Sequence, residues 1–113
     1  MTAPTIETAT AAPGLTMSAT SPIRHLCPFK DEADDGTITV AWRTLNGTLE
    51  LHSLRAYFRS FAAAEISHES ITDTIYRELQ RIPSVRVLDV STTWDTAGMG
   101  VRCSTSATPA ARP

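Results

Sequence analysis

Residues 36–45, Gly36-Thr-Ile-Thr-Val-Ala-Trp-Arg-Thr-Leu45, alternate between apolar and more polar side chains. Ile38, Val40 and Trp42 fall on one side of an extended chain, because successive side chains of a strand point to opposite faces. The alternation therefore predicts a strand with one buried face and one wetter face. Asn46-Gly47 supplies the turn chemistry that ends it.

A helix is predicted directly after this turn, because the spacing of the apolar residues changes at Glu50 from that of a strand to that of a helix. The residues at helical spacing are Leu51, Leu54, Tyr57, Phe58 and Phe61. His52, Arg55 and Arg59 point away from that stripe. An amphipathic helix with one face toward a core is the expected result.

A second helix is predicted to begin near Ser67, which is a favourable N-cap residue with Glu69 in the first turn that follows it. Its apolar stripe consists of Ile71, Ile75, Leu79 and Ile82. Pro83 ends the helix, because proline has no backbone N–H to continue the hydrogen bonding.

Strands are also predicted on both sides of the helical pair. Residues 15–26 alternate weakly and are broken by Ser21-Pro22, which favours an edge strand. Residues 84–94 and 97–104 alternate around the turn 95–98 and predict a hairpin. The order strand, strand, helix, helix, strand, strand favours an α+β domain, with an antiparallel sheet and both helices on one face.

The chain has 113 residues and 42% apolar content, which fits a single globular domain. Residues 1–13 and 105–113 are rich in Thr, Ala, Ser and Pro and are predicted to be flexible tails. The folded domain is then residues 14–104. A domain of this size buries a modest core, and assembly with further copies is a common supplement.

The formal net charge of −2, without a run of Lys or Arg, makes nucleic-acid binding an unfavourable interpretation. No apolar stretch approaches the length of a membrane span, and the first residues lack the basic start of a signal peptide. We therefore expect a cytoplasmic protein. In that compartment Cys27 and Cys103 are expected to be free thiols, with Cys103 as a small core residue.

Residues 25–35, His25-Leu-Cys-Pro-Phe-Lys-Asp-Glu-Ala-Asp-Asp35, bring a thiol, an imidazole and several carboxylates into one short segment. Cys27-Pro28 favours a loop, because a proline pushes the residue before it out of the helical region. Cys27 is a candidate nucleophile if its pKa is depressed or a base lies near it. The nearest groups that can exchange protons are Asp34, Asp35, His25 and His68. The acidic cluster alone would usually be a solvated loop.

His68-Glu69, at the start of the second helix, is a second candidate site. The Glu69 carboxylate can stabilise the helix dipole or offer two acceptor oxygens to a ligand with paired N–H donors. His25, Cys27 and His68 could also serve as three zinc ligands, although no C-x-x-C or H-x-x-x-H spacing supports a metal site.

Residues 50–57, Glu50-Leu-His-Ser-Leu-Arg-Ala-Tyr57, add a further motif. Together with Cys27-Pro28, Asp34 and His68-Glu69, this motif resembles the nitrile reductases that convert 7-cyano-7-deazaguanine to its aminomethyl form in the queuosine pathway of transfer-RNA modification. In that family a Cys-Pro carries the nucleophile, and an Asp follows it at the spacing of Asp34 from Cys27. A helix motif and then a His-Glu pair follow in the same order. The resemblance covers roughly residues 24–80.

The resemblance implies a tunnelling fold (T-fold) and a site chemistry. Cys27 would add to the nitrile carbon and form a covalent thioimide, with Asp34 as the general acid. His68, the third catalytic residue, would assist with protons or close the site over the intermediate. The substrate-binding residues would be Glu69, on the guanine-like edge, together with Glu50 and Leu51. No metal is implied.

The resemblance also implies NADPH as the cofactor, with His52, Ser53 and Arg55 as cofactor-binding residues. His52 stands where the family has the first Lys of its helix motif, and Arg55 keeps only the charge of the second. The substrate would be a small-molecule 7-deazapurine. The sites would lie between subunits of a homo-oligomer, a pentamer or a decamer.

Three other interpretations remain open. An enzyme with the same thioimide chemistry could use ammonia as the acceptor, as an amidinotransferase-type member of the family does, and the loss of the Lys at His52 motivates this alternative. A T-fold subunit could bind a purine-like ligand without catalysis. A zinc-dependent, cyclohydrolase-like variant of the same fold is the third.

Overall fold

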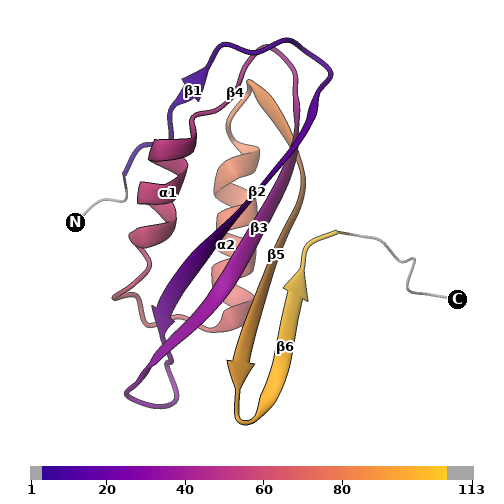
Figure 1. The fold of residues 1–113 in the computed structure, drawn as a ribbon. Coiled ribbons are helices and arrows are strands. Elements are labelled where there is room, and N and C mark those ends of the chain that lie inside the picture. The colour runs from indigo at the N-terminus through magenta and orange to yellow at the C-terminus, as the bar shows by residue number, and fades with distance from the viewer. Residues whose placement is uncertain (1–3, 107–113) are drawn as a thin grey trace, which may run out of the picture.

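A computed structural model describes residues 4–106 of the chain. Its centre is a four-stranded antiparallel sheet in the order β2-β3-β5-β6 (Figure 1). The strands are β2 (Thr16–Leu26), β3 (Ala33–Thr44), β5 (Val85–Thr96) and β6 (Met99–Ser104). Two short strands, β1 (Thr8–Ala9) and β4 (Thr48–Leu49), form a separate antiparallel pair.

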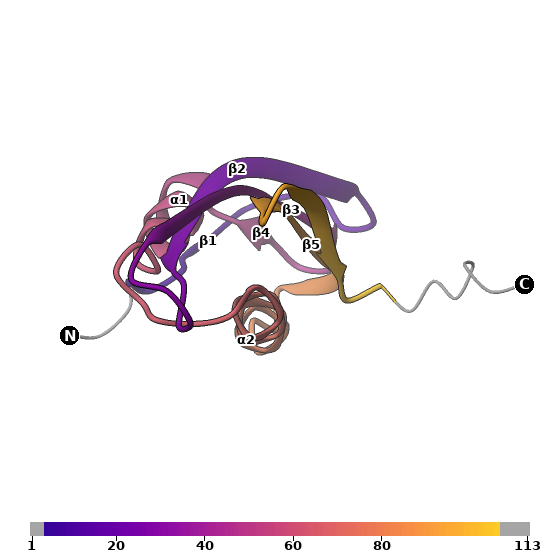
Figure 2. The same cartoon turned by 90° about the horizontal axis from the view of Figure 1, so that it is seen from below.

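Two helices, α1 (Leu51–Arg59) and α2 (His68–Gln80), cover one face of this sheet. Figure 2 shows the sheet curving over them, with α2 beneath β5 and α1 beneath β2. The predicted α+β architecture, with its order of strands and helices, is therefore confirmed. The strands β1 and β4 are additions that the alternation of side chains does not predict.

Both helices begin where the sequence predicts, because a side chain caps each of them. The Glu50 carboxylate accepts hydrogen bonds from the backbone N–H groups of His52 and Ser53 at the start of α1. The Ser67 hydroxyl accepts one from the backbone of Ser70 at the start of α2. These acceptors satisfy N–H groups that have no partner inside the helix.

The core lies between the sheet and the two helices. Ile38, Val40 and Trp42 of β3 are fully buried, as their alternation predicts. The helices contribute Leu54, Tyr57, Phe58, Ile71, Ile75 and Leu79. A fully buried aliphatic or aromatic side chain stabilises the fold by about 1.5–3 kcal/mol, so these two apolar stripes fix how the helices dock.

β3 begins at Ala33 rather than at Gly36, so Asp34 and Asp35 are strand residues. The prediction that the acidic cluster is a solvated loop is wrong for these two. The cause is pairing, because Asp34 lies opposite His25 in the ladder and Asp35 lies opposite Arg24. Likewise β5 continues to Thr96, and the hairpin turns at Ala97 and Gly98, which both have positive φ angles.

The predicted N-terminal tail and the predicted burial of Cys103 also differ from the structure. Within residues 1–13, β1 pairs with β4, and the Glu7 carbonyl accepts a hydrogen bond from the backbone N–H of Glu50, so this part is not a structureless tail. Residues 1–3 and 107–113 lie outside the described residues. Cys103 is only half-buried, on strand β6 at the sheet edge, and does not belong to the core. None of the described helices is long and apolar enough to cross a membrane.

Candidate active site

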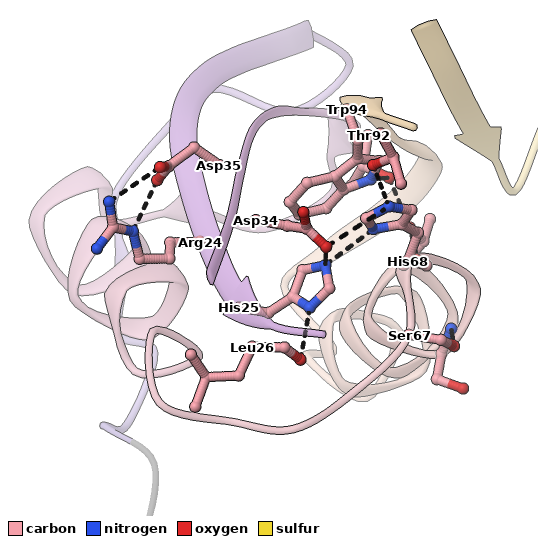
Figure 3. Close-up of polar contacts among 12 residues, drawn as sticks. Arg24, His25, Leu26, Asp34, Asp35, Ser67, His68, Thr92 and Trp94 are labelled. Atoms are coloured by element: carbon pink, nitrogen blue, oxygen red, sulfur yellow. Dashed lines mark hydrogen bonds and ion pairs between the residues drawn. The ribbon is translucent and has the colours of Figure 1, made fainter. Parts of the chain in front are cut away.

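The candidate site forms where the end of β2, the start of β3 and the start of α2 meet (Figure 3). His25 Nε2 lies 2.8 Å from His68 Nδ1, which is a hydrogen-bond distance. One oxygen of Asp34, Oδ2, lies 3.9 Å from His25 Nε2 and 4.0 Å from His68 Nε2. The predicted catalytic residues Asp34 and His68 are therefore brought together. The ring of His25, which belongs to β2, is close to both of them.

Trp94 of β5 supports both imidazole rings. His68 stacks on its indole with ring centroids 4.6 Å apart and planes 12° apart. His25 meets the same indole edge-on, at 4.7 Å and 81°. Because Trp94 is almost fully buried, this surface holds the orientation of both rings.

A chain of hydroxyl groups ties Trp94 to the backbone of α2. The indole N–H of Trp94 donates to Thr92 Oγ1 over 2.8 Å, and Thr92 and Thr72 are hydrogen-bonded over 2.7 Å. Thr72 Oγ1 in turn donates to the carbonyl oxygen of His68 over 2.8 Å. Both the ring and the main chain of His68 are thus held by buried contacts with β5.

Burial lowers the pKa of His68, and the neighbouring His25 lowers it further. Asp34 and Glu69 act in the opposite direction and offset part of the shift. His68 is consequently neutral at neutral pH, with one ring nitrogen able to accept a proton.

Cys27 lies in a loop directly after β2, as predicted, and is half-buried. Its backbone N–H donates to the carbonyl of Glu32, which closes the loop that leads to Asp34. The preceding residue, Leu26, exchanges backbone hydrogen bonds with Ala64 and Ile66, so the segment before α2 is attached to the end of β2. Cys27 thus follows His25 closely and lies at the end of the sheet that carries the histidine pair.

Glu69 is exposed in the first turn of α2. Within residues 4–106 its carboxylate has no hydrogen-bond partner, and it lines a groove of about 440 Å³ together with Tyr76 and Cys103. The groove lies between α2 and β6. The carboxylate is free to accept hydrogen bonds from a ligand there.

The predicted binding residues on α1 lie elsewhere. α1 begins beside β1 and β4, at the end of the molecule opposite to the start of α2 (Figure 1). The Glu50 carboxylate caps the helix and pairs with the exposed His52 ring at 2.9 Å. The Ser53 hydroxyl donates to the Glu50 carbonyl and accepts from the backbone of Glu7, while Leu51 is exposed. Within one chain these residues do not join Cys27.

Arg55 lies farther along α1, on a groove of about 200 Å³ between α1 and β2. Arg59 and Arg24 line the same groove. Arg24 forms an ion pair with Asp35 at 2.7 Å, whereas the other two guanidinium groups have no ion-pair or hydrogen-bond partner within residues 4–106. Two unpaired guanidinium groups suit a phosphate.

His25, Asp34 and His68 each offer a metal-ligating atom within 4.8 Å of the others, and Cys27 is not in this group of described residues. The zinc set suggested by the sequence would therefore have Asp34 in place of the thiol. However, the two imidazoles hydrogen-bond to each other, and a metal ion would have to break that bond. The geometry favours proton exchange within this group.

Sequence reasoning missed Trp94, Thr92, Thr72 and Thr96 as parts of the site. Thr96 Oγ1 lies 2.9 Å from His68 Nε2 and completes the surroundings of the ring. The alternation of β5 puts Thr92 and Trp94 on the buried face, but it carries no sign that this face meets His68. That contact depends on the docking of α2.

Comparisons with known proteins identify the family of the chain. A family model described as "QueF-like protein" matches residues 33–110. The chain is 37% identical over 73 residues to the NADPH-dependent 7-cyano-7-deazaguanine reductase of Chlorobium luteolum, a match that covers 65% of this chain and 63% of that relative. The reductase of Chlorobaculum parvum is 36% identical over the same length. The chain thus spans less than two thirds of these curated relatives.

A solved structure, the apo form of the archaeosine synthase QueF-Like, superposes with a TM-score of 0.72 and 16% sequence identity, and the match covers 84% of this chain and 94% of that one. This likeness confirms the tunnelling fold. The family model matches more than half of the chain, in the region that holds β3, both helices and the final hairpin. The chain belongs to the QueF-like protein family.

Proposed function

We propose that this protein reduces the nitrile of 7-cyano-7-deazaguanine to an aminomethyl group with NADPH, as a step toward queuosine. The observation that supports the proposal most is that His25, Asp34 and His68 gather at the end of β2, while Cys27 follows two residues after His25 in the loop that β2 leads into. Relatives with the reductase name add support. A reducing compartment such as the cytoplasm would keep Cys27 as a free thiol.

The first step is addition of the Cys27 sulfur to the nitrile carbon. The C–S bond forms as one π bond of the nitrile breaks, and the thiol proton passes through Asp34 to the nitrile nitrogen. The product is a thioimide. A nitrile is a poor electrophile, and nucleophilic catalysis coupled to a positioned acid lowers the barrier to the addition.

Each later hydride addition to carbon needs one proton at nitrogen. Asp34 delivers that proton. His68, whose pKa is lowered by burial, takes up a proton from water at its unprotonated ring nitrogen and returns it to Asp34. The 4.0 Å between His68 Nε2 and Asp34 Oδ2 is close enough for such a transfer after a small movement or through one water molecule. After the first hydride addition the C–S bond breaks, which returns the proton and the free thiol to Cys27 and leaves an imine. The second hydride and a second proton convert this imine to the amine, so two hydrides and two protons are used in all.

Substrate recognition falls to Glu69. Its carboxylate oxygens can accept paired hydrogen bonds from the N–H groups of a guanine-like ring, and no other described group occupies them. The base would lie in the groove between α2 and β6.

NADPH supplies the hydride when it is bound. The described residues that fit its phosphates are Arg55 and Arg59, which line the groove between α1 and β2. His52 and Ser53 could contribute once their contacts with Glu50 and Glu7 exchange for contacts with the cofactor.

A homo-oligomer would bring the two parts of the site together. The start of α1, which carries Glu50 and Leu51, lies at the opposite end of the molecule from the end of β2, after which Cys27 follows (Figure 1). Glu50 and Leu51 would therefore reach a substrate at Cys27 only from a neighbouring subunit. The outer strands β2 and β6 each pair on one side only among the described strands, and further copies could pair there. A pentamer or a decamer would close such a ring.

The experiment is a turnover assay with 7-cyano-7-deazaguanine and NADPH, in which cofactor absorbance and the aminomethyl product are both followed. Loss of two NADPH per product is the expected stoichiometry. A boiled sample and a sample without nitrile are the controls. A protein that binds the nitrile without consuming NADPH contradicts the reductase assignment.

A second candidate uses ammonia in place of hydride. Its motivation is His52, which stands at the first Lys of the family motif and is paired with Glu50 here. This alternative predicts an amidine product when ammonium is supplied, with no NADPH consumed. A non-catalytic, purine-binding subunit predicts ligand binding with neither product.

A further inference from the structure

His25 has no assigned role in the proposed reaction, yet it is the most buried titratable side chain at the site, with 1% of its surface exposed. Its Nδ1 lies 3.0 Å from the carbonyl oxygen of Leu26. A carbonyl oxygen can only accept, so Nδ1 of His25 must carry a proton. In the neutral ring, Nε2 is then an acceptor.

The direction of the remaining hydrogen bonds follows from this proton. His25 Nε2 accepts, so His68 Nδ1 donates across the 2.8 Å contact. His68 Nε2 is therefore the unprotonated nitrogen of its neutral ring. It accepts from the hydroxyl of Thr96, which lies 2.9 Å away. The donor and the acceptor are thereby assigned in all three hydrogen bonds that run from the Leu26 carbonyl through the two rings to the Thr96 hydroxyl.

We propose that His25 is a positioning residue that holds His68 in the tautomer protonated on Nδ1, so that His68 takes up and releases protons only at Nε2. Nε2 is the nitrogen that lies 4.0 Å from the Asp34 carboxylate. This inference rests on the proposed function, because it explains how His68 could return protons to Asp34. The same logic, an acceptor that fixes the tautomer of a catalytic imidazole, operates in hydrolase triads.

The surroundings make this arrangement rigid. Trp94 packs against both rings, and Asp34, Thr96 and Glu69 are the other polar groups that face or influence His68. The Leu26 carbonyl that holds His25 also accepts from the backbone of Ile66, just before α2. The loop that carries Cys27 and the tautomer of His68 are therefore set by the same end of β2.

The test is nuclear magnetic resonance of protein labelled with ¹⁵N in its histidines. The chain has three histidines, and His52 is identified by its exposed ring. Long-range N–H correlations show which ring nitrogen carries the proton. In the unmodified protein we expect protonated Nδ1 and unprotonated Nε2 for His68. A His68 ring protonated on Nε2 overturns the proposal.

Two variants separate positioning from packing. In His25→Gln, the amide oxygen can still accept from His68 Nδ1, so the tautomer should persist. In His25→Leu, no acceptor remains, and His68 should move toward the tautomer protonated on Nε2. An unchanged His68 tautomer in His25→Leu overturns the proposal, provided that thermal unfolding shows a folded protein.

Turnover gives the functional measure. We expect His25→Leu to lower kcat by roughly 10²-fold, in the range of a lost acid–base contribution, with little change in KM. His25→Gln should recover most of that loss. Equal losses in the two variants overturn the proposal. Because the tautomer is measured without turnover, failure of the reductase assay and failure of this inference remain distinguishable.

Discussion

The imidazole of His68 lies flat against the indole of Trp94, with ring centroids 4.6 Å apart and ring planes 12° apart. In the β3–β5 ladder, Trp94 is paired with Gly36. A Cβ atom at Gly36 would collide with the Trp94 ring and with the carbonyl of Thr93. The absence of a side chain at Gly36 therefore lets Trp94 lie where it supports His68.

We predict that Gly36→Ala is destabilising, because the added methyl group has to displace Trp94 or the β5 backbone. Overpacking of this kind costs about 1–3 kcal/mol of unfolding free energy, measured by urea denaturation. Gly100→Ala is the matched control, since nothing lies within 4 Å of a Cβ atom there. Equal urea midpoints for the two variants would show that Trp94 does not need the space.

Thr92→Val should weaken the fold as well. The substitution keeps the shape of the side chain but removes the acceptor of the Trp94 indole N–H and the partner of Thr72. A buried donor without a partner costs about 1–3 kcal/mol. Thr93→Val, at the exposed neighbouring position, is the control. The account of the hydroxyl chain fails if both variants unfold at the same temperature.

Glu50 should contribute to stability in a way that depends on pH. Hydrogen bonds from the backbone of His52 and Ser53 lower its pKa from 4.5 to about 2. A lowered pKa in the folded state gives stabilisation that is full above pH 4.5 and is lost as the pH falls toward 2. The difference in melting temperature between the unmodified protein and Glu50→Ala should therefore shrink over that interval.

Glu50→Gln serves as the control for charge, because its amide oxygen can still cap the helix. The melting temperature of Glu50→Gln relative to Glu50→Ala should change little with pH. A difference between the unmodified protein and Glu50→Ala that stays constant from pH 7 to pH 2 would show that the lowered pKa of the Glu50 carboxylate does not stabilise the fold.

Arg55→Gln should raise the KM for NADPH, because it removes a guanidinium group from the groove between α1 and β2. A lost charge-assisted hydrogen bond of about 1.5–3 kcal/mol corresponds to roughly a 10- to 100-fold increase. Arg77→Gln is the matched control, because it makes the same chemical change at a residue that pairs with Asp73 on the exposed face of α2. An unchanged KM in Arg55→Gln would place the cofactor elsewhere.

The alternation of side chains and the capping residues predict most of the fold, because local periodicity determines which face of each element is buried. Ile38, Val40 and Trp42 are buried, and Ser67 caps its helix, as predicted. The pair β1 and β4 is not predictable in this way, since two-residue strands have no period to detect. The residue types of Asp34 and Asp35 favour a loop. Their pairing with residues of β2 nevertheless makes them part of a strand, and this pairing cannot be seen in the local sequence.

The site was predictable in its residue types and only partly in its arrangement. Cys27, Asp34 and His68 could be identified as candidates from the sequence. The hydrogen bond between His25 and His68 joins residues 43 positions apart, and only the docking of α2 on the sheet creates it. The role of Glu50 also depends on the structure. The resemblance implies that Glu50 contacts the substrate, whereas within one chain its carboxylate caps α1.

The central claim, that Cys27 attacks a nitrile, is tested most directly by intact-protein mass spectrometry after mixing with 7-cyano-7-deazaguanine in the absence of NADPH. We predict a mass increase of one substrate molecule for the unmodified protein and for Cys103→Ala, which removes the other cysteine. Cys27→Ala should show no increase while remaining folded, because Cys27 is half-buried in a loop. An adduct that persists in Cys27→Ala, or no adduct in the unmodified protein, would contradict the account.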